Sequence, residues 1–384
     1  MAERIARRGV TGIRSRAAAA SNRFEADCHR LRRLHECTVG WYFSSWIEHL
    51  AAAGWSIVLV HTADARHDGL TDRMNRLARE NIVLPTNIAD SARAIRALDA
   101  DIVLYPELGM DGFVFALAAL RLAPHQVCAW GHPVTTGLPT IDVFLSCTEM
   151  EPLDADSHYS EKLIRLPGIG TKYTSPHIPI AQAPASLGLP TDRPLYLMPQ
   201  TLYKLHPASD RILVEIVRRD PRAVFVLFEL RSPSPALLVR DRLLRALSAV
   251  SKSPHAHLFW IPECSRDDYL RVNQACSVMI DTPHWSGGNA TLDALHCGLP
   301  IVTCPGTFMR GRQSAAMLRM LCCDELIAAN IEGLADIAVA IAHDRDRRNR
   351  IAERIRERLP AMIQFDAPLL ALDAALRSLI TAGR

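Results

Sequence analysis

The residues best suited to chemistry lie between Ser277 and Thr303, in the stretch SVMIDTPHWSGGNATLDALHCGLPIVT. An apolar run is followed by Gly287 and Gly288, then by a helical pattern and a second β-rich run. Loop glycines let a ligand approach the backbone closely, and the N–H groups at a helix start attract anions. This order predicts a phosphate-binding turn. An ordinary strand–helix turn is the alternative.

Two polar residues of this stretch extend the prediction toward a nucleotide. Asn289 is predicted to be the N-cap of a helix that begins near Ala290. Asp293 lies one turn into that helix, where its carboxylate could accept hydrogen bonds from ribose hydroxyls. Phosphate and ribose are both parts of a nucleotide, so a nucleotide-binding site is the expectation.

A lysine follows another predicted strand, in the segment Met198–Pro207, MPQTLYKLHP. Lys204 is one of only four lysines in a chain rich in arginine. A lysine at this position could stand against a diphosphate as a compact charge. A solvated loop lysine is the alternative that this segment alone favours.

Two further polar loops could contribute to a binding cleft. The loop AWGHPVTTGLPTID could line the opposite wall with Gly131, His132, Thr135, Thr136 and Gly137. A structural turn explains the same residues equally well. The loop PGTFMRGRQSAA offers Arg310 and Arg312 to a phosphate or carboxylate, with surface arginines as the alternative.

Metal-binding and thioredoxin-type motifs are missing from the sequence. Asp-x-Asp triplets occur at Asp99–Asp101, Asp154–Asp156 and Asp344–Asp346, and we ascribe them to chance in a chain with 41 acidic residues. The 15 histidines show no HExxH spacing, and the ten cysteines form no CxxC pair. We therefore expect no metal cofactor and a reducing, cytoplasmic location.

Length and charge narrow the class of protein. A chain of 384 residues has room for two domains, and a net charge of +3 is too small to indicate a nucleic-acid partner. No apolar run reaches the ~18–20 residues of a membrane span, so no membrane partner is expected. The start of the chain, rich in Arg and Ala, lacks the apolar core of a secretory signal, although a transit peptide would have this composition too.

Short apolar strands alternate with helices in two series, which is typical of parallel sheets wound with helices. We predict an irregular segment 1–35, a first Rossmann-like domain 36–172, a linker 173–193, a second domain 194–345 and a helical tail 346–384. The strands are predicted at 56–61, 102–105, 126–130, 143–146, 195–198, 223–228, 257–261, 278–282 and 301–303. The helices predicted between them include 70–80, 113–122 and 266–275. The predicted fold is α/β, with two Rossmann-like domains facing a cleft.

Several of these segments together resemble one enzyme family. AWGHPVTTGLPTIDVFLS, YSEKLIRLPGIG, MPQTLYKLHP, HWSGGNATLDALHCGLPIVTCPG and MRGRQSAAMLR look, in this order, like the catalytic region of O-linked N-acetylglucosamine transferases. More narrowly they resemble bacterial SPINDLY-like members of glycosyltransferase family 41. The resemblance implies a GT-B fold, a UDP-sugar donor, and metal-independent transfer with inversion to a protein hydroxyl. UDP-N-acetylglucosamine is the expected donor.

The same resemblance implies roles for individual residues. Lys204 looks like the lysine that meets the UDP phosphates, and Asp293 looks like the aspartate that binds the ribose. The other expected nucleotide contacts are Gln200, Arg266, Tyr269, Gly287, Gly288, Asn289 and Ala290. The expected acceptor-side residues are Gly131, Pro133 and Thr136. No residue is a convincing general base, and His132 is a candidate because it is polar and lies in the acceptor loop.

The sequence also departs from this family's pattern. Cys37 stands where close relatives carry a histidine, and Ala290 replaces a hydroxyl residue at the helix start. The run FEADCHRLRRL is too charged for the buried strand expected there. We therefore expect residues 1–34 to be poorly ordered or atypically packed, and catalysis to be weak. A UDP-sugar-binding protein without turnover and a GT-B UDP-sugar epimerase are the alternatives to an active transferase.

Overall fold

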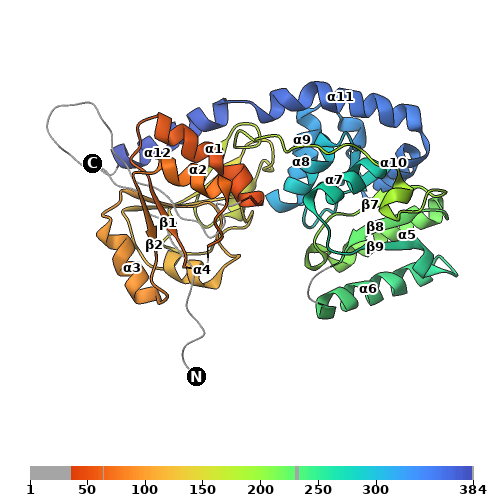
Figure 1. The fold of residues 1–384 in the computed structure, drawn as a ribbon, viewed down its shortest axis with the longest axis horizontal. Helices are drawn as coiled ribbons and strands as arrows, with labels where there is room; N and C mark the ends of the chain where they lie inside the picture. The colour runs from red at the N-terminus through yellow and green to blue at the C-terminus, as the bar shows by residue number, and fades with distance from the viewer. Residues whose placement is uncertain (1–35, 64, 230–232, 383–384) are drawn as a thin grey trace. The chain divides into compact units, whose positions relative to one another are not determined.

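The computed structural model describes residues 36–63, 65–229 and 233–382 (Figure 1). The chain divides into two compact units. Residues up to Thr174 and from Ile363 onward form the first, and Ser175–Met362 form the second. The division falls inside the predicted linker, and residues 175–193 belong to the second unit. The predicted irregular segment 1–35 lies outside the described residues.

The first unit contains a parallel four-stranded sheet and a separate parallel strand pair. The sheet has the order β3-β4-β5-β6, and β1 pairs with β2. The strands of the first unit are β1 (Val58–His61), β2 (Glu80–Val83), β3 (Ile102–Tyr105), β4 (His125–Ala129), β5 (Val143–Cys147) and β6 (Lys162–Leu166). Its helices are α1 (Thr38–Ala52), α2 (Gly69–Leu77), α3 (Ile88–Ala97), α4 (Gly112–Ala118) and α12 (Ala367–Ala382).

The second unit contains one parallel five-stranded sheet of order β11-β10-β7-β8-β9. Its strands are β7 (Leu195–Leu197), β8 (Val224–Phe228), β9 (Leu258–Ile261), β10 (Val278–Ile280) and β11 (Ile301–Val302). Its helices are α5 (Asp210–Arg219), α6 (Pro233–Ser248), α7 (Arg266–Ala275), α8 (Asn289–His296), α9 (Gln313–Met320), α10 (Ile331–His343) and α11 (Arg345–Ile363), of which α11 ends one residue beyond this unit. Successive strands are added on one side of β7 as far as β9 and on its other side from β10 onward. Parallel sheets of this kind bind ligands at the point between β7 and β10 where the strand order reverses.

Both sheets form because their strands are almost entirely apolar. The strand β3 has the sequence IVLY and β10 the sequence VMI, and every residue of both is buried. Continuous apolar runs suit parallel strands that are covered on both faces. Several helices begin at polar caps, for example α2 at Asp68, whose side chain accepts from the N–H of Leu70 and Thr71. Sequence and local structure therefore agree over most of both units.

Two strands were not predicted from the sequence. β2, ENIV, lies at an exposed position, and the helix predicted over Leu70–Glu80 ends at Leu77 because Ala78 is extended. β6, KLIRL, carries Lys162 and Arg165 among its apolar residues, and this pattern hides a strand at the edge of its sheet. The helix predicted to reach Leu122 ends at Ala118. Charged edge strands are a common means of limiting aggregation.

The end of the chain packs onto the first unit. Trp55 Nε1 donates to Asp373 Oδ1 at 2.5 Å, and Arg377 Nη2 donates to the Ala53 carbonyl at 3.1 Å. Leu372 and Leu376 of α12 are fully buried. The stretch Arg345–Thr381 is long and apolar enough to qualify as a membrane span by composition, but buried helices of soluble proteins pass the same test. These contacts show α12 as a packing element of this unit.

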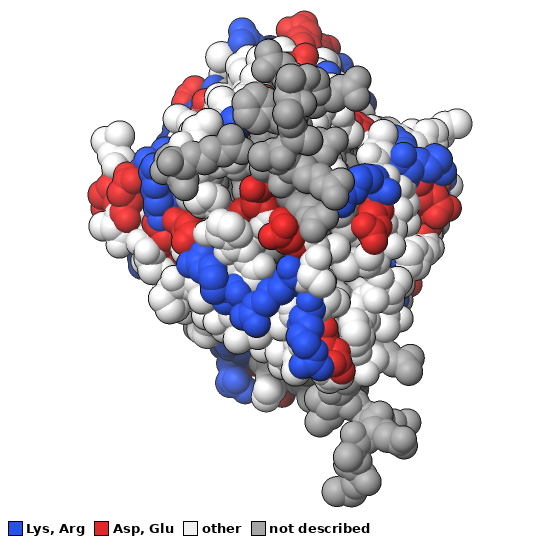
Figure 2. Space-filling model, turned by 90° about the vertical axis from the view of Figure 1, so that its left-hand side faces the viewer, with Lys and Arg blue, Asp and Glu red and all other residues white. Residues whose placement is uncertain are grey.

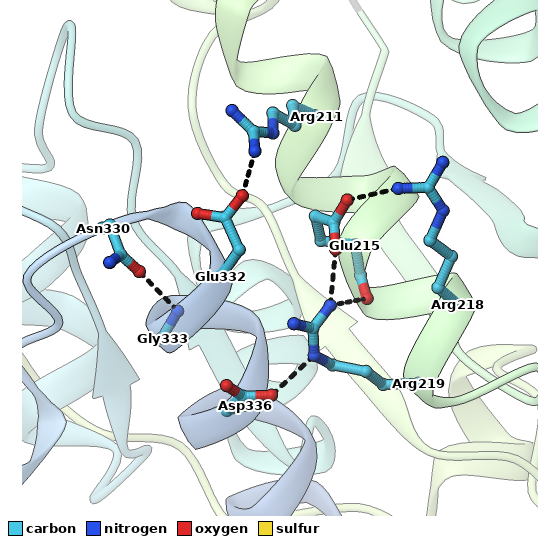
Figure 3. A network of polar contacts seen from close by, with 8 residues as sticks. All are labelled: Arg211, Glu215, Arg218, Arg219, Asn330, Glu332, Gly333 and Asp336. Atoms are coloured by element: carbon cyan, nitrogen blue, oxygen red, sulfur yellow. Dashed lines mark hydrogen bonds and ion pairs between the residues drawn. The ribbon is translucent and has the colours of Figure 1, made fainter.

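A network of ion pairs fastens α10 to α5 in the second unit (Figure 3). Arg219 contacts Glu215 Oε2 at 2.6 Å on its own helix and Asp336 Oδ1 at 2.6 Å on α10. Arg211 pairs with Glu332 in the same way. Partly exposed pairs contribute about 0–1 kcal/mol each, so their main effect is to fix how the two helices align.

Charges of both signs are mixed on the surface. On the face shown in Figure 2, basic side chains form a central band and several separate patches, and acidic side chains lie among them. This distribution accords with the small net charge of +3.

Candidate functional site

The predicted phosphate turn and the predicted lysine leave neighbouring strands of the second sheet. β7 and β10 pair directly, with Leu197 opposite Met279, so both following loops start at the same edge. Lys204 ends a short 3₁₀ helix, Leu202–Lys204, and its Nζ lies 5.1 Å from the ring centroid of Trp285. The structure thus brings Lys204 next to the glycine loop at the point where the strand order reverses.

The glycine loop is tightly packed. A Cβ on Gly287 would lie 2.6 Å from Thr291 Oγ1, so a larger residue would displace the start of α8. The predicted N-cap is wrong: Gly288 is the N-cap, and Asn289 is the first helical residue. The Asn289 amide instead donates to Asp293 Oδ2 at 2.9 Å, one turn further on. An N-cap asparagine accepts a backbone N–H through its side-chain oxygen, whereas Asn289 here donates through its amide nitrogen to a buried carboxylate.

Arg266, Tyr269 and Asp293, all predicted as nucleotide contacts, lie together. Arg266 Nη1 donates to Asp293 Oδ2 at 2.6 Å, and Nη2 contacts Oδ1, which makes a bidentate pair. The Arg266 guanidinium also lies 5.4 Å from the Tyr269 ring centroid. Asp293 is 1% exposed. Burial raises its pKa, and the pair with Arg266 opposes that shift. A ribose would share this carboxylate with Arg266.

Gln200 lies in the loop after β7 and is 5% exposed. Its Nε2 has no hydrogen-bond partner among the described residues. A buried amide donor without a partner costs about 1–3 kcal/mol, which a ligand acceptor would offset. Gln200 therefore stays the predicted nucleotide contact of this loop.

A stacked histidine pair in the same two loops was not predicted. The rings of His206 and His284 are 4.0 Å apart between centroids, with an interplanar angle of 11°. Burial, and then the nearby His206 and Arg310, lower the pKa of His284. Both histidines follow predicted strands, and this position in the sequence could have indicated them.

The two predicted arginines of the next loop make local contacts. Arg310 lies over the Phe308 ring, and Arg312 donates to the Gly306 carbonyl at 3.0 Å.

A buried aspartate at the end of β10 was also missed. Asp281 is 0% exposed, and its carboxylate accepts hydrogen bonds from the Gly287 N–H at 2.7 Å and from two hydroxyls. These belong to Ser286, at 2.8 Å, and Thr303, at 2.7 Å. Burial raises the pKa of Asp281 to about 6, although the three hydrogen bonds oppose the shift. The sequence shows Asp281 at the end of an apolar run, but its hydrogen-bond partners could not be predicted from that position.

Asp281 makes the stability of the protein dependent on pH. Its pKa in the folded protein, about 6, exceeds the ordinary 3.8, so the folded state binds the proton more tightly. The protonated Asp281 side chain therefore contributes to the free energy of unfolding in full below pH 3.8, and this contribution is lost as the pH rises to about 6. Between pH 5 and 7.5 the wild type should lose about 1.4 kcal/mol relative to Asp281→Asn. Urea unfolding of both proteins at each pH measures this, and parallel curves would refute it.

Two of the expected acceptor-side residues, Gly131 and Pro133, follow the carboxyl end of β4. A Cβ on Gly131 would come 2.5 Å from the Pro106 carbonyl and 2.9 Å from Glu107 Cβ. His132 follows directly, and a Cβ on Gly109 would lie 2.9 Å from its Cδ2. Pro133 is buried. The loops after β3 and β4 therefore pack closely, and they hold Gly131 and His132 in place.

Replacing Gly131 by alanine should destabilise the first unit by about 3 kcal/mol, because the added methyl overlaps backbone that cannot move aside. Gly112→Ala is the matched control, since a Cβ there meets nothing within 4 Å. Thermal or urea unfolding compares the two variants. Equal stabilities would contradict the close packing.

Thr136 and Cys37 lie elsewhere in the first unit. The N–H of Thr136 donates to Glu161 Oε1 at 2.7 Å, and Thr135 Oγ1 donates to Oε2 at 2.7 Å. Glu161 immediately precedes β6, so this part of the loop lies at the amino edge of the sheet. Burial opposes ionisation of Glu161, but these bonds keep its pKa below the usual value. Cys37 is the half-buried N-cap residue of α1 and makes no side-chain cap.

Comparison with known proteins gives these residues a context. The family model described as glycosyl transferase family 41 matches residues 169–370, which is more than half of the chain. A tomato (Solanum lycopersicum) SPINDLY protein, named as a probable UDP-N-acetylglucosamine–peptide N-acetylglucosaminyltransferase, is 27% identical over 62% of this chain. The match covers 25% of that relative, so the chain spans about a quarter of its length.

Two further similarities cover more of the chain. A UDP-glucose:protein N-β-glucosyltransferase of Actinobacillus pleuropneumoniae is 26% identical over 72% of this chain and 44% of its own. The solved structure of a mutant O-GlcNAc transferase of Thermobaculum terrenum has a TM-score of 0.78 and 26% identity. It covers 93% of this chain and 67% of its own. The two parallel α/β units accordingly have the GT-B fold, and the chain belongs to glycosyltransferase family 41.

Proposed function

We propose that this protein transfers a sugar from a UDP-sugar to a protein side chain, with N-acetylglucosamine as the sugar and serine or threonine hydroxyls as acceptors. The observation that carries the proposal is the gathering of Lys204, the glycine loop and the Arg266–Asp293 pair where the strand order of a family 41 chain reverses. The names of the similar proteins support both substrate classes.

The residues suit a nucleoside diphosphate in a specific way. Lys204 and the start of α8 supply positive charge for the phosphates, and Gln200 supplies a buried donor. In the proposed step the acceptor oxygen attacks the anomeric carbon opposite the diphosphate. The bond to UDP breaks, and the configuration inverts. Lys204 then stabilises the charge of the departing UDP without a metal ion. His132 is the candidate to take the hydroxyl proton.

Incubation with radiolabelled UDP-sugars and host lysate tests the proposal. Label should enter protein from UDP-N-acetylglucosamine, and alkaline β-elimination should release it from serine or threonine. Conversion of the free nucleotide sugar into an isomer would identify an epimerase instead. UDP binding without labelling or hydrolysis would identify a binding protein. A GDP-sugar serves as the control for the nucleotide. The same proposal places the protein in the cytoplasm, where its ten cysteines stay reduced.

A second candidate is glucosyl transfer to an asparagine amide. It is favoured by the glucosyltransferase relative, whose match covers more of this chain than the SPINDLY match. UDP-glucose would then label protein better than UDP-N-acetylglucosamine. The linkage would resist alkaline β-elimination, because an amide-linked sugar has no β-leaving oxygen. The same assay therefore separates the two transferases.

Cys37 bears on how fast any transfer is. A thiol near neutral pH is mostly protonated and is a weak hydrogen-bond donor, so it is a poor substitute for an imidazole. We expect Cys37→His to raise transferase activity about tenfold, less than the roughly 10²–10⁴-fold of an optimally positioned acid or base. Cys37→Ser is the control and should give no gain. Robust transfer by the wild type, unchanged in Cys37→His, would show that this position has no catalytic role.

A further inference from the structure

We propose that Asp281 is a positioning residue of the donor site, which fixes the glycine loop and couples it to the segment 303–314. This inference rests on the proposed function, since it names what holds the proposed phosphate turn in place. Asp281 itself is fully buried at the end of β10 and would act through the loop rather than by touching a substrate.

The three donors to Asp281 come from two parts of the chain, the glycine loop and the end of β11. Oδ1 accepts the Gly287 N–H, and Oδ2 accepts the hydroxyls of Ser286 and Thr303. Ser286 is 2% exposed and Thr303 is 0% exposed. One carboxylate therefore joins the end of β10, the glycine loop and the end of β11. A fully satisfied buried network of this kind makes its surroundings rigid.

A second set of hydroxyls extends the network to two helices. Ser314, at the start of α9, donates its N–H to Ser286 Oγ at 2.9 Å. Its own hydroxyl lies 2.9 Å from Ser286 Oγ and 2.6 Å from Thr291 Oγ1 on α8. Ser314 and Thr291 are both 0% exposed. The start of α8, which would face the phosphates, is thereby tied to the segment that contains α9.

The backbone closes the same contact. The Ser286 N–H donates to the Arg310 carbonyl at 2.6 Å. The Pro283 carbonyl lies against Gly306 and Gly311, and neither position has room for a Cβ. The glycine loop and the segment 303–314 consequently cannot shift independently.

A carboxylate suits this position because three donors converge on it. A hydroxyl is too short to contact all three donors. An amide can keep the three contacts, but its bonds are weaker, since bonds to an ionised acceptor are roughly twice as strong as neutral ones. The partners of the charge are all neutral, so burying it costs stability. We therefore infer that the Asp281 carboxylate serves to order the glycine loop and does not stabilise the folded protein.

The test measures loop order and UDP affinity in the full chain. Hydrogen exchange of the peptide 283–290 without ligand reports loop order, and calorimetry with UDP reports the dissociation constant. Asp281→Ala should speed exchange and weaken UDP binding, each by about 30-fold, because the Gly287 N–H loses its partner. Asp281→Asn should restore most of both, since the amide can accept from Gly287 and donate to the two hydroxyls. A purely structural role would lower the free energy of unfolding and leave UDP affinity unchanged.

Single substitutions elsewhere in the network keep the test decisive if Asp281→Ala does not fold. Thr303→Val and Ser314→Ala each remove part of the network and should weaken UDP binding about fivefold. Ser209→Ala is the control, because Ser209 is 2% exposed in the same unit and its hydroxyl has no partner among the described residues. Unchanged UDP affinity in the folded variants, with or without faster exchange, would overturn the inference. A wild type that binds no UDP would refute the proposed function instead, and exchange alone would then decide whether Asp281 orders the loop.

Discussion

Lys204→Ala should lower kcat/KM for sugar transfer by about 100-fold, equivalent to ~3 kcal/mol of transition-state stabilisation. The lysine lies beside the glycine loop, 5.1 Å from the Trp285 ring centroid, where it would meet the charge that develops on the departing diphosphate. The loss should be larger in kcat than in UDP affinity, because the charge on the leaving group grows in the transition state. Steady-state kinetics and UDP calorimetry together measure the division.

Two further variants serve as controls for this prediction. Lys252→Ala removes an exposed lysine of the same unit and should leave both constants unchanged. Lys204→Arg keeps the charge but spreads it over a planar fork, so it should recover activity only in part. If folded Lys204→Ala transfers sugar as fast as the wild type, Lys204 is not the diphosphate ligand and the site assignment fails.

Arg266→Ala should destabilise the second unit by about 3 kcal/mol, since it leaves the Asp293 carboxylate buried without its cation. Asp293→Asn should cost less. The Arg266 side chain is 35% exposed and can turn to water when its partner is neutral. This asymmetry distinguishes a buried anion that needs its partner from a symmetric surface pair.

Urea unfolding of Arg266→Ala, Asp293→Asn and the double variant measures the asymmetry. The double variant should be more stable than Arg266→Ala alone, because the unpaired charge is gone. An Arg266→Ala cost below about 1 kcal/mol would show that the pair behaves like an ordinary surface salt bridge. Binding of UDP and 2′-deoxy-UDP to Asp293→Asn then tests the ribose role separately. The two ligands should differ less in that variant than in the wild type.

The sequence predicted the elements that carry the donor site more accurately than their side-chain partners. Apolar strands and glycine turns are local signals, so β3 was predicted at its observed bounds, as was α7. The stacking of His206 on His284 and the partners of Asp281 depend on which strands become neighbours. No local pattern encodes a pairing of β7 with β10 across 80 residues.

The errors have more local origins. Asn289 was predicted as an N-cap from its residue type, but the helix starts one residue earlier and the Asn289 amide donates to Asp293 one turn on. Thr136, expected on the acceptor side, lies in a loop that joins parallel strands and so must cross from one sheet edge to the other. Its second half reaches Glu161 at the amino edge. The edge strands β2 and β6 were hidden by charged residues that an exposed or edge position tolerates.

The return of α12 to the first unit has a consequence for biosynthesis. This unit is discontinuous in sequence, and Trp55 and Ala53 of its early part bind Asp373 and Arg377 of its last helix. A ribosome would therefore release the complete second unit before the first could finish folding. The early part would wait with the apolar face that covers Leu372 and Leu376 still open to water. Nascent chains stalled before residue 367 should consequently bind chaperones through the first unit, although the second is already folded.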